Sequence, residues 1–445
     1  MKRIFGDFAY ETARIKTCYW AEGVPDSTLT TSPLQGDQQA EVGIIGAGFT
    51  GLNAALHLAQ DGISTTVVDA HFPGWGASGR NGGFCCLGGA KASSTQLTRT
   101  YGNDARRAYR QAEKDAVTHV ADLLTQHHIN ADTHSQGETQ MAHNPRAFAA
   151  FTQQAEQVQA DYGLTAQIIP RAALPDHGLA GPFHGAMTIP HGFGLNPRKY
   201  LAGLLRVAHA AGARVHSHSP VTRIESSSGG YVLHLPNGRL RCRKLIIATN
   251  GYSSDDVPPW MAARYIPAQS SVLVTRPLTD DEIATSGWSS DQAAYDSRNL
   301  LHYFRLMPNR RFLFGMRGGL RATPAADAAI QRQIRREFDT MFPAWANVET
   351  PHYWSGMVCL AANLVPFCGP IPEMPGAFAG FAYHGNGVAM GSYTGTLLAD
   401  LVLGKPTRLP HPAIMQTPPK RFPLGPLRRA LMWPAYAVKA LQDRA

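Results

Sequence analysis

Residues 41–69, EVGIIGAGFTGLNAALHLAQDGISTTVVD, decide the fold. The pattern predicts a short apolar strand, a glycine-rich turn, a helix rich in alanine and leucine, and a second strand ending at Asp69. Gly46 permits the tight turn, Gly48 lets the backbone approach a pyrophosphate, and Gly51 allows the helix to pack closely on the strand. The helix N-terminus then directs its free N–H groups at a phosphate. Asp69 stands where a carboxylate can accept hydrogen bonds from ribose hydroxyls. The stretch therefore predicts a dinucleotide-binding βαβ unit.

A second glycine-rich segment, PGWGASGRNGGF over residues 73–84, follows that unit. A nicotinamide-binding domain would normally continue here into another strand and helix. This loop can instead lie along the rest of a long cofactor, with Ser78, Arg80 and Asn81 offering donors to phosphate and ring. A flexible surface loop without a ligand is the alternative.

The segments VGIIGAGFTGLNAALHLAQDG and GWGASGRNGGF together resemble the N-terminal signature of the D-amino-acid oxidase-like FAD-dependent oxidoreductases. This superfamily includes glycine, sarcosine and γ-glutamylputrescine oxidases. The ASGRNGG segment, the YW-containing N-terminal extension and the basic C-terminal tail are most similar to the γ-glutamylputrescine oxidase branch. Cys359 and Cys368 do not fall at the spacing that some relatives use to attach flavin, so we expect non-covalent FAD.

The resemblance implies an α/β fold (α+β overall), with a discontinuous Rossmann-like FAD-binding domain and a substrate domain built on a mainly antiparallel sheet. The expected division is an N-terminal extension over 1–40, an FAD-binding domain over 41–95, 185–260 and 350–405, a substrate domain over 96–184 and 261–349, and a basic tail over 406–445. Hydrophobic periodicity and capping residues predict helices over 103–128, 146–160, 325–341, 388–403 and 427–441, and another that starts at Asn196-Pro197. Two-residue turns are expected at Asn237-Gly238 and Asn309-Arg310.

The resemblance also supplies cofactor contacts far from the first motif. Val221 would contact the adenine through its backbone, and Asn250 and Gly251 would close over the pyrophosphate. The helix after residues 385–387 would aim its N-terminus at the flavin and stabilise negative charge on the reduced ring. The complete expected set is Gly46, Gly48, Phe49, Thr50, Gly51, Asp69, Ala70, Gly76, Ala77, Ser78, Arg80, Asn81, Gly82, Gly83, Val221, Thr249, Asn250, Gly251, Gly385, Asn386, Gly387 and Val388.

The implied reaction is oxidative deamination of a small-molecule amine. A hydride passes from the carbon bearing the nitrogen to flavin, the imine hydrolyses, and oxygen reoxidises the flavin to give hydrogen peroxide. The amine must be neutral for this step. The alternative is a flavin dehydrogenase of an amino acid or N-methyl amino acid that passes its electrons to a quinone or carrier.

One departure from the family bears on the substrate. Amino-acid-oxidising members carry an arginine after Trp-x-Gly-x that clamps the substrate carboxylate, whereas here the segment reads WSGMV and ends at Val358. A valine cannot bind a carboxylate bidentately. Either the substrate lacks an α-carboxylate, or Arg305 or Arg317 holds it. The family's Thr-x-Asp reads AAN over 361–363, which further favours an amine such as a γ-glutamylated diamine.

Aromatic and histidine side chains complete the candidate catalytic set. His384 precedes the flavin helix and is a candidate for a place near the ring or for oxygen activation. Tyr252, Tyr303 and Phe304 are candidates for an aromatic wall around a cationic amine, and His302 for a proton acceptor. Ordinary core packing is the alternative for each. The expected catalytic set is His384, Tyr252, Tyr303, Arg305 and Arg317.

Composition bounds the remaining classes. The 445 residues are 44% hydrophobic and 16% charged, which excludes disorder and coiled coil. The net charge of +9 is scattered, so we expect no nucleic-acid partner, and six cysteines without a CxxC pair predict no metal site. No secretory signal or transmembrane segment is recognised, so the expected location is cytoplasmic. The sequence leaves open a homodimer and docking of the basic tail on its own domain, a second subunit or an anionic membrane.

Overall fold

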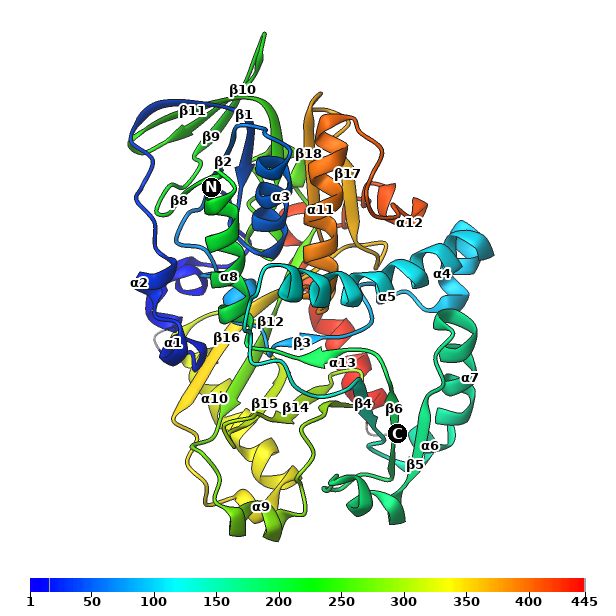
Figure 1. Cartoon of the computed structure of the whole chain (residues 1–445). Coiled ribbons are helices and arrows are strands. Elements are labelled where there is room, and N and C mark those ends of the chain that lie inside the picture. Colours follow the sequence, from blue (N-terminus) through cyan, green and yellow to red (C-terminus); the bar gives the residue numbers. More distant parts are fainter. Residues whose placement is uncertain (16, 444–445) are drawn as a thin grey trace.

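Two eight-stranded sheets form the framework of the protein, one above the other in Figure 1. The computed structural model describes residues 1–15 and 17–443, so the last two residues of the expected basic tail lie outside the described part. A two-stranded ribbon of β3 (Phe84–Cys85) and β7 (Phe193–Gly194) forms a third, small sheet. The α/β fold with a Rossmann-like domain and a second, mainly antiparallel sheet is confirmed.

The first sheet has the order β17-β18-β11-β1-β2-β8, with the β9–β10 hairpin attached to β11. Its strands are β1 (Gly36–Ile45), β2 (Thr65–Val68), β8 (Arg214–His216), β9 (Arg223–Ser227), β10 (Gly230–Leu235), β11 (Gly238–Ile247), β17 (Phe367–Pro370) and β18 (Ala377–Phe381). The central pairs β1–β2, β1–β11, β2–β8 and β11–β18 are parallel. Parallel strands need covered faces, and α3 (Phe49–Gln60), α8 (Pro197–Ala210) and α11 (Ala389–Leu403) stand beside the sheet in Figure 1.

Glycine sets the close packing of these layers. A Cβ on Gly51, in α3, would lie 1.9 Å from the carbonyl oxygen of Gly46 at the end of β1. A Cβ on Gly395, in α11, would lie 2.3 Å from the carbonyl oxygen of Thr50 in α3. Neither contact tolerates a side chain, so glycine lets α3 lie tightly between β1 and α11.

The second sheet has the order β16-β12-β15-β14-β13-β4-β6-β5, and only its β13–β4 pair is parallel among these named strands. Its strands are β4 (Glu138–Met141), β5 (Gln167–Pro170), β6 (Gly185–Ile189), β12 (Ile266–Val274), β13 (Ala293–Asp296), β14 (His302–Leu306), β15 (Phe312–Arg317) and β16 (His352–Leu360). Helix α10 (Pro324–Met341) covers one face through a cluster that contains Phe312, Phe338 and Trp345.

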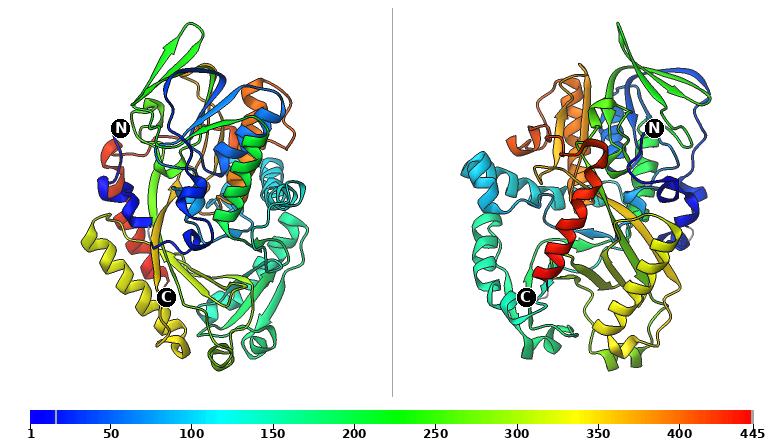
Figure 2. Two further views of the ribbon diagram at one scale, coloured as in Figure 1. Left: turned by 60° about the vertical axis from the view of Figure 1, so that its left-hand side comes forward. Right: turned by 180° about the vertical axis from the view of Figure 1, so that it is seen from behind.

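The remaining elements connect or flank these layers (Figures 1 and 2). Within the described residues they are α1 (Trp20–Gly23), α2 (Asp26–Leu29), α4 (Ser94–Tyr101), α5 (Asn103–Gln126), α6 (Pro145–Ala149), α7 (Phe151–Tyr162), α9 (Asp280–Ser286), α12 (Ala413–Gln416), α13 (Met432–Gln442) and nine short 3-10 segments, of which η9 (Gly425–Leu431) precedes α13. None of the helices within residues 1–15 and 17–443 combines the length and apolar character that crossing a bilayer requires.

Several expected boundaries were wrong. Strands β6 and β16 pair with strands of the second sheet, so the expected FAD-domain segments that begin at 185 and 350 each start with a strand of the other sheet. Leu235 pairs with Gly238, which makes Pro236-Asn237 the hairpin turn and Gly238 the first residue of the next strand. The helix expected over 146–160 is interrupted at Ala150.

The C-terminal tail docks on its own chain. The side chain of Arg428 is fully buried; it donates to both carboxylate oxygens of Asp255, at 2.8 and 2.6 Å, and to the carbonyl oxygen of Tyr265 at 2.7 Å. Met432 packs on Ile266 in a small apolar cluster. Seen from behind in Figure 2, α13 runs down the centre of the molecule. The helix expected over 427–441 begins as the 3-10 segment η9.

Replacing Arg428 with alanine would leave the Asp255 carboxylate without its buried cation. We expect the Arg428→Ala variant to lose about 3 kcal/mol of unfolding free energy, because breaking a buried pair strands the remaining charge. Urea denaturation measures this loss. Arg223→Ala is the control, since its ion pair with Glu225 is exposed and should contribute less than about 1 kcal/mol. Equal losses in the two variants would contradict the buried-anchor interpretation.

Candidate functional site

One cavity of ≈ 440 Å³ connects the two sheets. Its lining includes the β1–α3 turn of the first sheet and side chains from β12, β13, β14, β15 and β16 of the second. It also includes the loop after β2 and the segment between β18 and α11. Segments that are far apart in the sequence therefore meet around a single hollow space.

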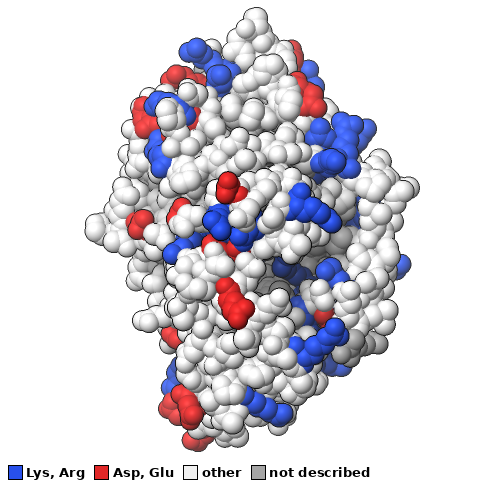
Figure 3. All heavy atoms as spheres, turned by 90° about the vertical axis from the view of Figure 1, so that its right-hand side faces the viewer, with Lys and Arg blue, Asp and Glu red and all other residues white. Residues whose placement is uncertain are grey.

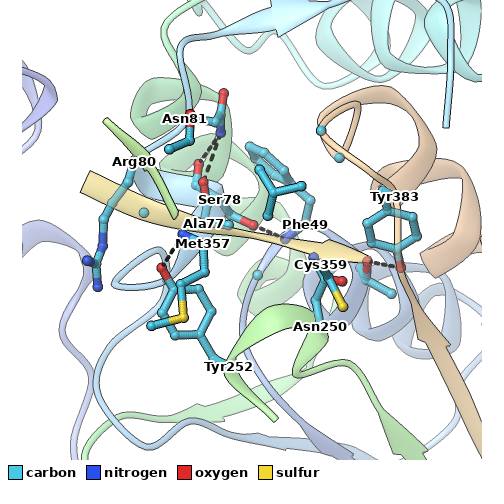
Figure 4. Close-up of a pocket in the computed structure, with 18 of the residues that line it drawn as sticks. Phe49, Ala77, Ser78, Arg80, Asn81, Asn250, Tyr252, Met357, Cys359 and Tyr383 are labelled. Carbon is cyan, nitrogen blue, oxygen red and sulfur yellow. Dashed lines mark hydrogen bonds between the residues drawn. The ribbon is translucent and has the colours of Figure 1, made fainter. Parts of the chain in front are cut away.

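The β1–α3 turn forms one end of the cavity. Helix α3 begins at Phe49, whose backbone N–H donates to Ser78 Oγ at 2.9 Å (Figure 4). The N–H of the next residue, Thr50, has no intrahelical acceptor, and Thr50 lines the cavity. A Cβ on Gly48 would lie 2.8 Å from Ser78 Oγ, so this position accepts only glycine. No side chain therefore covers the backbone where the helix N-terminus faces the cavity. This arrangement is an anion cradle.

Asp69 stands at the end of β2 and lines the same region. Its carboxylate accepts the backbone N–H of Ala47 at 2.8 Å and that of His71 at 2.9 Å. Burial raises the pKa of Asp69, against the effect of these two hydrogen bonds. The carboxylate thus ties the glycine-rich turn to the second strand while remaining on the cavity wall.

In the loop over residues 76–84, the side-chain donors that the sequence assigned to the cofactor form hydrogen bonds within the protein. Asn81 Nδ2 donates to the carbonyl oxygens of Ala77 and Ser78, at 3.1 and 3.0 Å (Figure 4). Arg80 donates to the carbonyl oxygens of Trp75 and Ser355, and its guanidinium lies 4.1 Å from the Trp75 ring centroid. Both side chains line the cavity, yet their observed contacts shape the loop and attach it to β16.

The segment before α11 closes the cavity from another side. His384 Nδ1 donates to the carbonyl oxygen of Gly89 at 2.7 Å, and its Nε2 accepts the N–H of Ala361 at 3.2 Å. Burial lowers the pKa of His384 to about 4. The ring is therefore neutral at physiological pH with both nitrogens engaged, which suits holding the backbone in place and not donating a proton.

Most of the expected cofactor contacts meet at this cavity. Gly51 lies beneath the turn, Gly83 lies against Leu195, and Gly251 packs on Met357 and Cys359, so these three glycines are outside the lining. Those in the lining are Gly46, Gly48, Phe49, Thr50, Asp69, Ala70, Gly76, Ala77, Ser78, Arg80, Asn81, Gly82, Val221, Thr249, Asn250, Gly385, Asn386, Gly387 and Val388.

Three members of the expected catalytic set besides His384 line the cavity. The Tyr252 hydroxyl accepts the N–H of Met357 at 3.2 Å (Figure 4). The Tyr303 hydroxyl lies 2.9 Å from Ser270 Oγ, and Arg317 lies at the end of β15. These side chains come from three different segments of the chain and form part of one wall.

Arg305 does not reach the cavity, which corrects its place in the expected set. It is fully buried, donates to the carbonyl oxygen of Leu195 at 2.7 Å and lies 3.0 Å from His134 Nε2. Burial lowers the pKa of Arg305 to about 9. Because Gly83 and Gly194 lack side chains, the guanidinium fits against their backbone, where it supports the fold.

Phe304 and His302 alternate with Tyr303 along β14 and lie on the opposite face of the sheet. Phe304 packs on Trp288 in the aromatic cluster, and His302 lies between Asp296 and Glu337. These carboxylates raise the pKa of His302 to about 9. Neither side chain lines the cavity.

Sequence reasoning missed several lining residues. Glu138 begins β4, Tyr295 lies in β13, and Lys91 lies between the glycine-rich loop and α4. No motif surrounds any of them, and β4 belongs to a region in which only helices were singled out. Nothing in the residues around Glu138 marks a site. Only the pairing of β4 with β13, in which Glu138 faces Ala293, brings it to the same cavity as Tyr295.

Comparison with known proteins decides the family. The family model described as "FAD dependent oxidoreductase", the DAO family, matches residues 41–401. The chain belongs to this family. It is an FAD-dependent oxidoreductase, as the first two motifs indicated.

Relatives match this FAD-dependent oxidoreductase over most of its length. A probable oxidoreductase OrdL of Rhizobium meliloti is 32% identical, covering 96% of this chain and 97% of that one. The gamma-glutamylputrescine oxidoreductase of Escherichia coli is 27% identical, covering 91% and 93%. The crystal structure of glycine oxidase from Geobacillus kaustophilus has a TM-score of 0.69 at 19% identity, covering 85% and 98%, which shows a shared fold.

The chain's own residues fit FAD. The bare backbone at Gly48 and the N-terminus of α3 can hold a pyrophosphate, and Asp69 stands one strand away at the same edge of the sheet. The cavity then continues to the second sheet, which leaves room for a cofactor longer than a mononucleotide and for a substrate. We propose these residues as the FAD-binding site.

Replacing Gly48 with valine should abolish FAD retention. Its Cβ would lie 2.8 Å from Ser78 Oγ, and its methyl groups would fill the space between the α3 N-terminus and the loop. The measurement is the visible flavin absorbance of the purified variant relative to protein concentration. Gly229→Val is the control, because nothing lies within 4 Å of a Cβ there. Full flavin content in the Gly48 variant would contradict the proposed site.

Proposed function

We propose that the protein oxidises an amine whose reacting carbon bears no carboxylate, with a γ-glutamylated diamine as the leading candidate. The observation that carries this proposal is the side chain of Val358, which lines the cavity at the position where amino-acid-oxidising members of the family carry an arginine. A valine there gives a carboxylate next to the reacting carbon no bidentate partner.

The positions of the other two candidate arginines support the same conclusion. Arg305 is fully buried with its donors on Leu195 and His134, so it is unavailable to a substrate. Arg317 lines the cavity, but it lies at the end of β15, whereas Val358 lies in β16 and pairs with Ala268 of β12. A carboxylate held by Arg317 therefore need not be the one beside the reacting carbon.

The relatives add to this proposal. The Escherichia coli protein that covers 91% of this chain is named a gamma-glutamylputrescine oxidoreductase. Its name identifies an amine whose reacting end is separated from its carboxylate by an amide and a carbon chain. This separation matches a cavity with Val358 on its wall and an arginine elsewhere.

The chain's residues would bind and orient such an amine. FAD, when bound, would accept the hydride from the carbon next to nitrogen. The rings of Tyr252 and Tyr303 would offer their faces to a cationic amine. Helix α11 begins at Ala389, directly after a stretch that lines the cavity, so its positive N-terminal end favours negative charge nearby. His384 would keep that stretch in place through Gly89 and Ala361.

The reduced flavin must pass its electrons to an acceptor. We propose oxygen, with hydrogen peroxide as product, and a quinone or carrier remains the alternative. Cytoplasmic location and a homodimer also stay predictions. All three are decided by measurements on the purified protein.

An anaerobic titration of the flavin spectrum tests the function. We expect γ-glutamylputrescine to bleach the flavin at concentrations at which sarcosine and D-alanine do not, because these α-amino acids need the arginine that Val358 replaces. Admitting air and measuring hydrogen peroxide then separates an oxidase from a dehydrogenase. Bleaching by the α-amino acids alone would overturn the proposal.

The Val358→Arg variant tests the specificity argument directly. A guanidinium at this position should raise kcat/KM for α-amino acids relative to γ-glutamylputrescine by roughly tenfold or more, the effect of one charge-assisted hydrogen-bonded pair. Steady-state kinetics with both substrates measure the ratio. Val358→Leu, which changes size without charge, is the matched control. An unchanged ratio in the arginine variant would refute the role given to this position.

A further inference from the structure

Glu138, Lys91 and Arg317 are ionisable side chains in the cavity lining. None of these three forms an ion pair within the described part of the chain. The other acid in the lining, Asp69, is held by two backbone N–H groups. Ionisable groups beside a cavity that have no counterion in the protein are suited to charges on a ligand.

Glu138 is the acidic group of the second-sheet end. It is 4% exposed, and β4 pairs with β13, which carries Tyr295, and with β6. Burial raises its pKa to about 8, against hydrogen bonds from the Cys86 thiol and the backbone N–H of Leu87, which lower it. The titratable groups that interact with it are thiols, phenols and another acid, namely Cys85, Cys86, Glu113, Tyr162 and Tyr295. No cation is among them, so the surroundings leave this carboxyl to a cation that enters the cavity.

Arg317 and Lys91 form a separate basic region. Arg317 lowers the pKa of Lys91, which burial and this neighbour bring to about 8. A Cβ on Gly385 would lie 3.6 Å from Arg317 Nη2, so the guanidinium lies beside the segment that leads to α11. Lys439 of α13 acts on Lys91 in the same direction. Figure 3 shows a face of the molecule where lysine and arginine side chains gather around a hollow.

The acidic and basic regions do not neutralise each other. Arg317 is in β15 and Glu138 is in β4, and the order β15-β14-β13-β4 places these strands three positions, about 14 Å, apart in the second sheet. The cavity therefore presents a buried acid at one place and a pair of cations at another. A ligand complementary to both must carry opposite charges separated by a chain.

We propose that Glu138 binds the ammonium group of the substrate and takes its proton, while Arg317 and Lys91 bind a carboxylate at the far end of the same molecule. This inference rests on the proposed function and deepens it, since it names the substrate class as an amine with a distant carboxylate. It also assigns Glu138 a direct contact with the reacting end.

The proton transfer balances without another reactant. The ammonium N–H bond breaks and an O–H bond forms on Glu138, so an ammonium and a carboxylate become a neutral amine and a carboxylic acid. The neutral amine keeps its lone pair, which the loss of hydride from the adjacent carbon requires. A carboxyl with a pKa near 8 is a better proton acceptor than an ordinary glutamate, whose pKa is about 4.

Two analogues that cannot undergo the reaction separate the two ends. The first is γ-glutamylputrescine with two methyl groups on the amine-bearing carbon, which then has no hydrogen to transfer. The second is γ-glutamylbutylamine, which lacks the terminal ammonium. Calorimetry on the FAD-loaded protein measures both affinities. We expect Glu138→Gln to weaken the dimethyl analogue roughly 30-fold or more and to leave γ-glutamylbutylamine unchanged.

A different pattern is expected at the basic end, where both analogues should be affected. Arg317→Gln should weaken both analogues roughly tenfold or more, because both keep the carboxylate. Glu225→Gln is the control for loss of one negative charge, since Glu225 is exposed on β9 outside the cavity, and it should change neither affinity. Equal weakening of both analogues by Glu138→Gln would indicate a disturbed cavity and overturn the assignment, as would no weakening at all.

The pH dependence gives a second readout for Glu138. Below a pKa of about 8 the empty protein holds the carboxyl protonated, and binding of an ammonium must displace that proton. The dissociation constant of the dimethyl analogue should therefore rise about tenfold per unit as pH falls from 8 to 6, relative to γ-glutamylbutylamine. In Glu138→Gln this difference should disappear. A slope that persists in the variant would contradict the proposal.

Different results would refute the role of Glu138 and the proposed function. If γ-glutamylputrescine bleaches the flavin but Glu138→Gln binds both analogues as the wild type does, the proposed function stands and the role of Glu138 is refuted. If the wild type binds neither analogue and no amine bleaches the flavin, the proposed function fails and this inference fails with it.

Discussion

The close approach of α3 to its two neighbours is the constraint on which the rest of the structure depends. Gly51 lets the helix contact the end of β1, and Gly395 lets α11 contact the helix from the other side. A side chain at either position would overlap with the neighbouring backbone, so the layers could not stay in contact. With the layers in contact, the N-termini of both helices reach one cavity, and their partial positive charges act on the same space.

The second sheet completes that space because its strands come from distant parts of the chain. β4, β12 and β16 lie on both sides of the dinucleotide-binding segments in sequence, yet they belong to one sheet. The sheet therefore brings Glu138, Tyr303 and Val358 to a cavity whose other walls come from the first sheet. Specificity can vary through this sheet without disturbing the glycine contacts that hold the cofactor-binding layers together.

Several site residues could be predicted in place but not in role. Ser78 and Asn81 line the cavity, as the glycine-rich loop implied. The Asn81 amide, however, donates its hydrogen bonds to carbonyl oxygens of the loop itself. His384 was a candidate for a place near the ring or for oxygen activation. Burial keeps its ring neutral, and hydrogen bonds to Gly89 and from Ala361 engage both nitrogens. Arg305 was expected at the substrate, but two glycines opened a place for it inside the fold. Hydrogen-bond partners are tertiary facts, and no local pattern encodes them.

The sequence by itself determined the dinucleotide-binding unit and the family, because these depend on residue types at short, regular spacings. Strand, turn and helix over residues 41–69 follow from local sterics and hydrophobic periodicity alone. Only the tertiary structure decided that β6 and β16 belong to the second sheet and that Glu138 shares a cavity with Arg317. Strand pairing depends on long-range hydrogen bonds and shared burial, so residues that face one cavity can be separated by more than half of the chain.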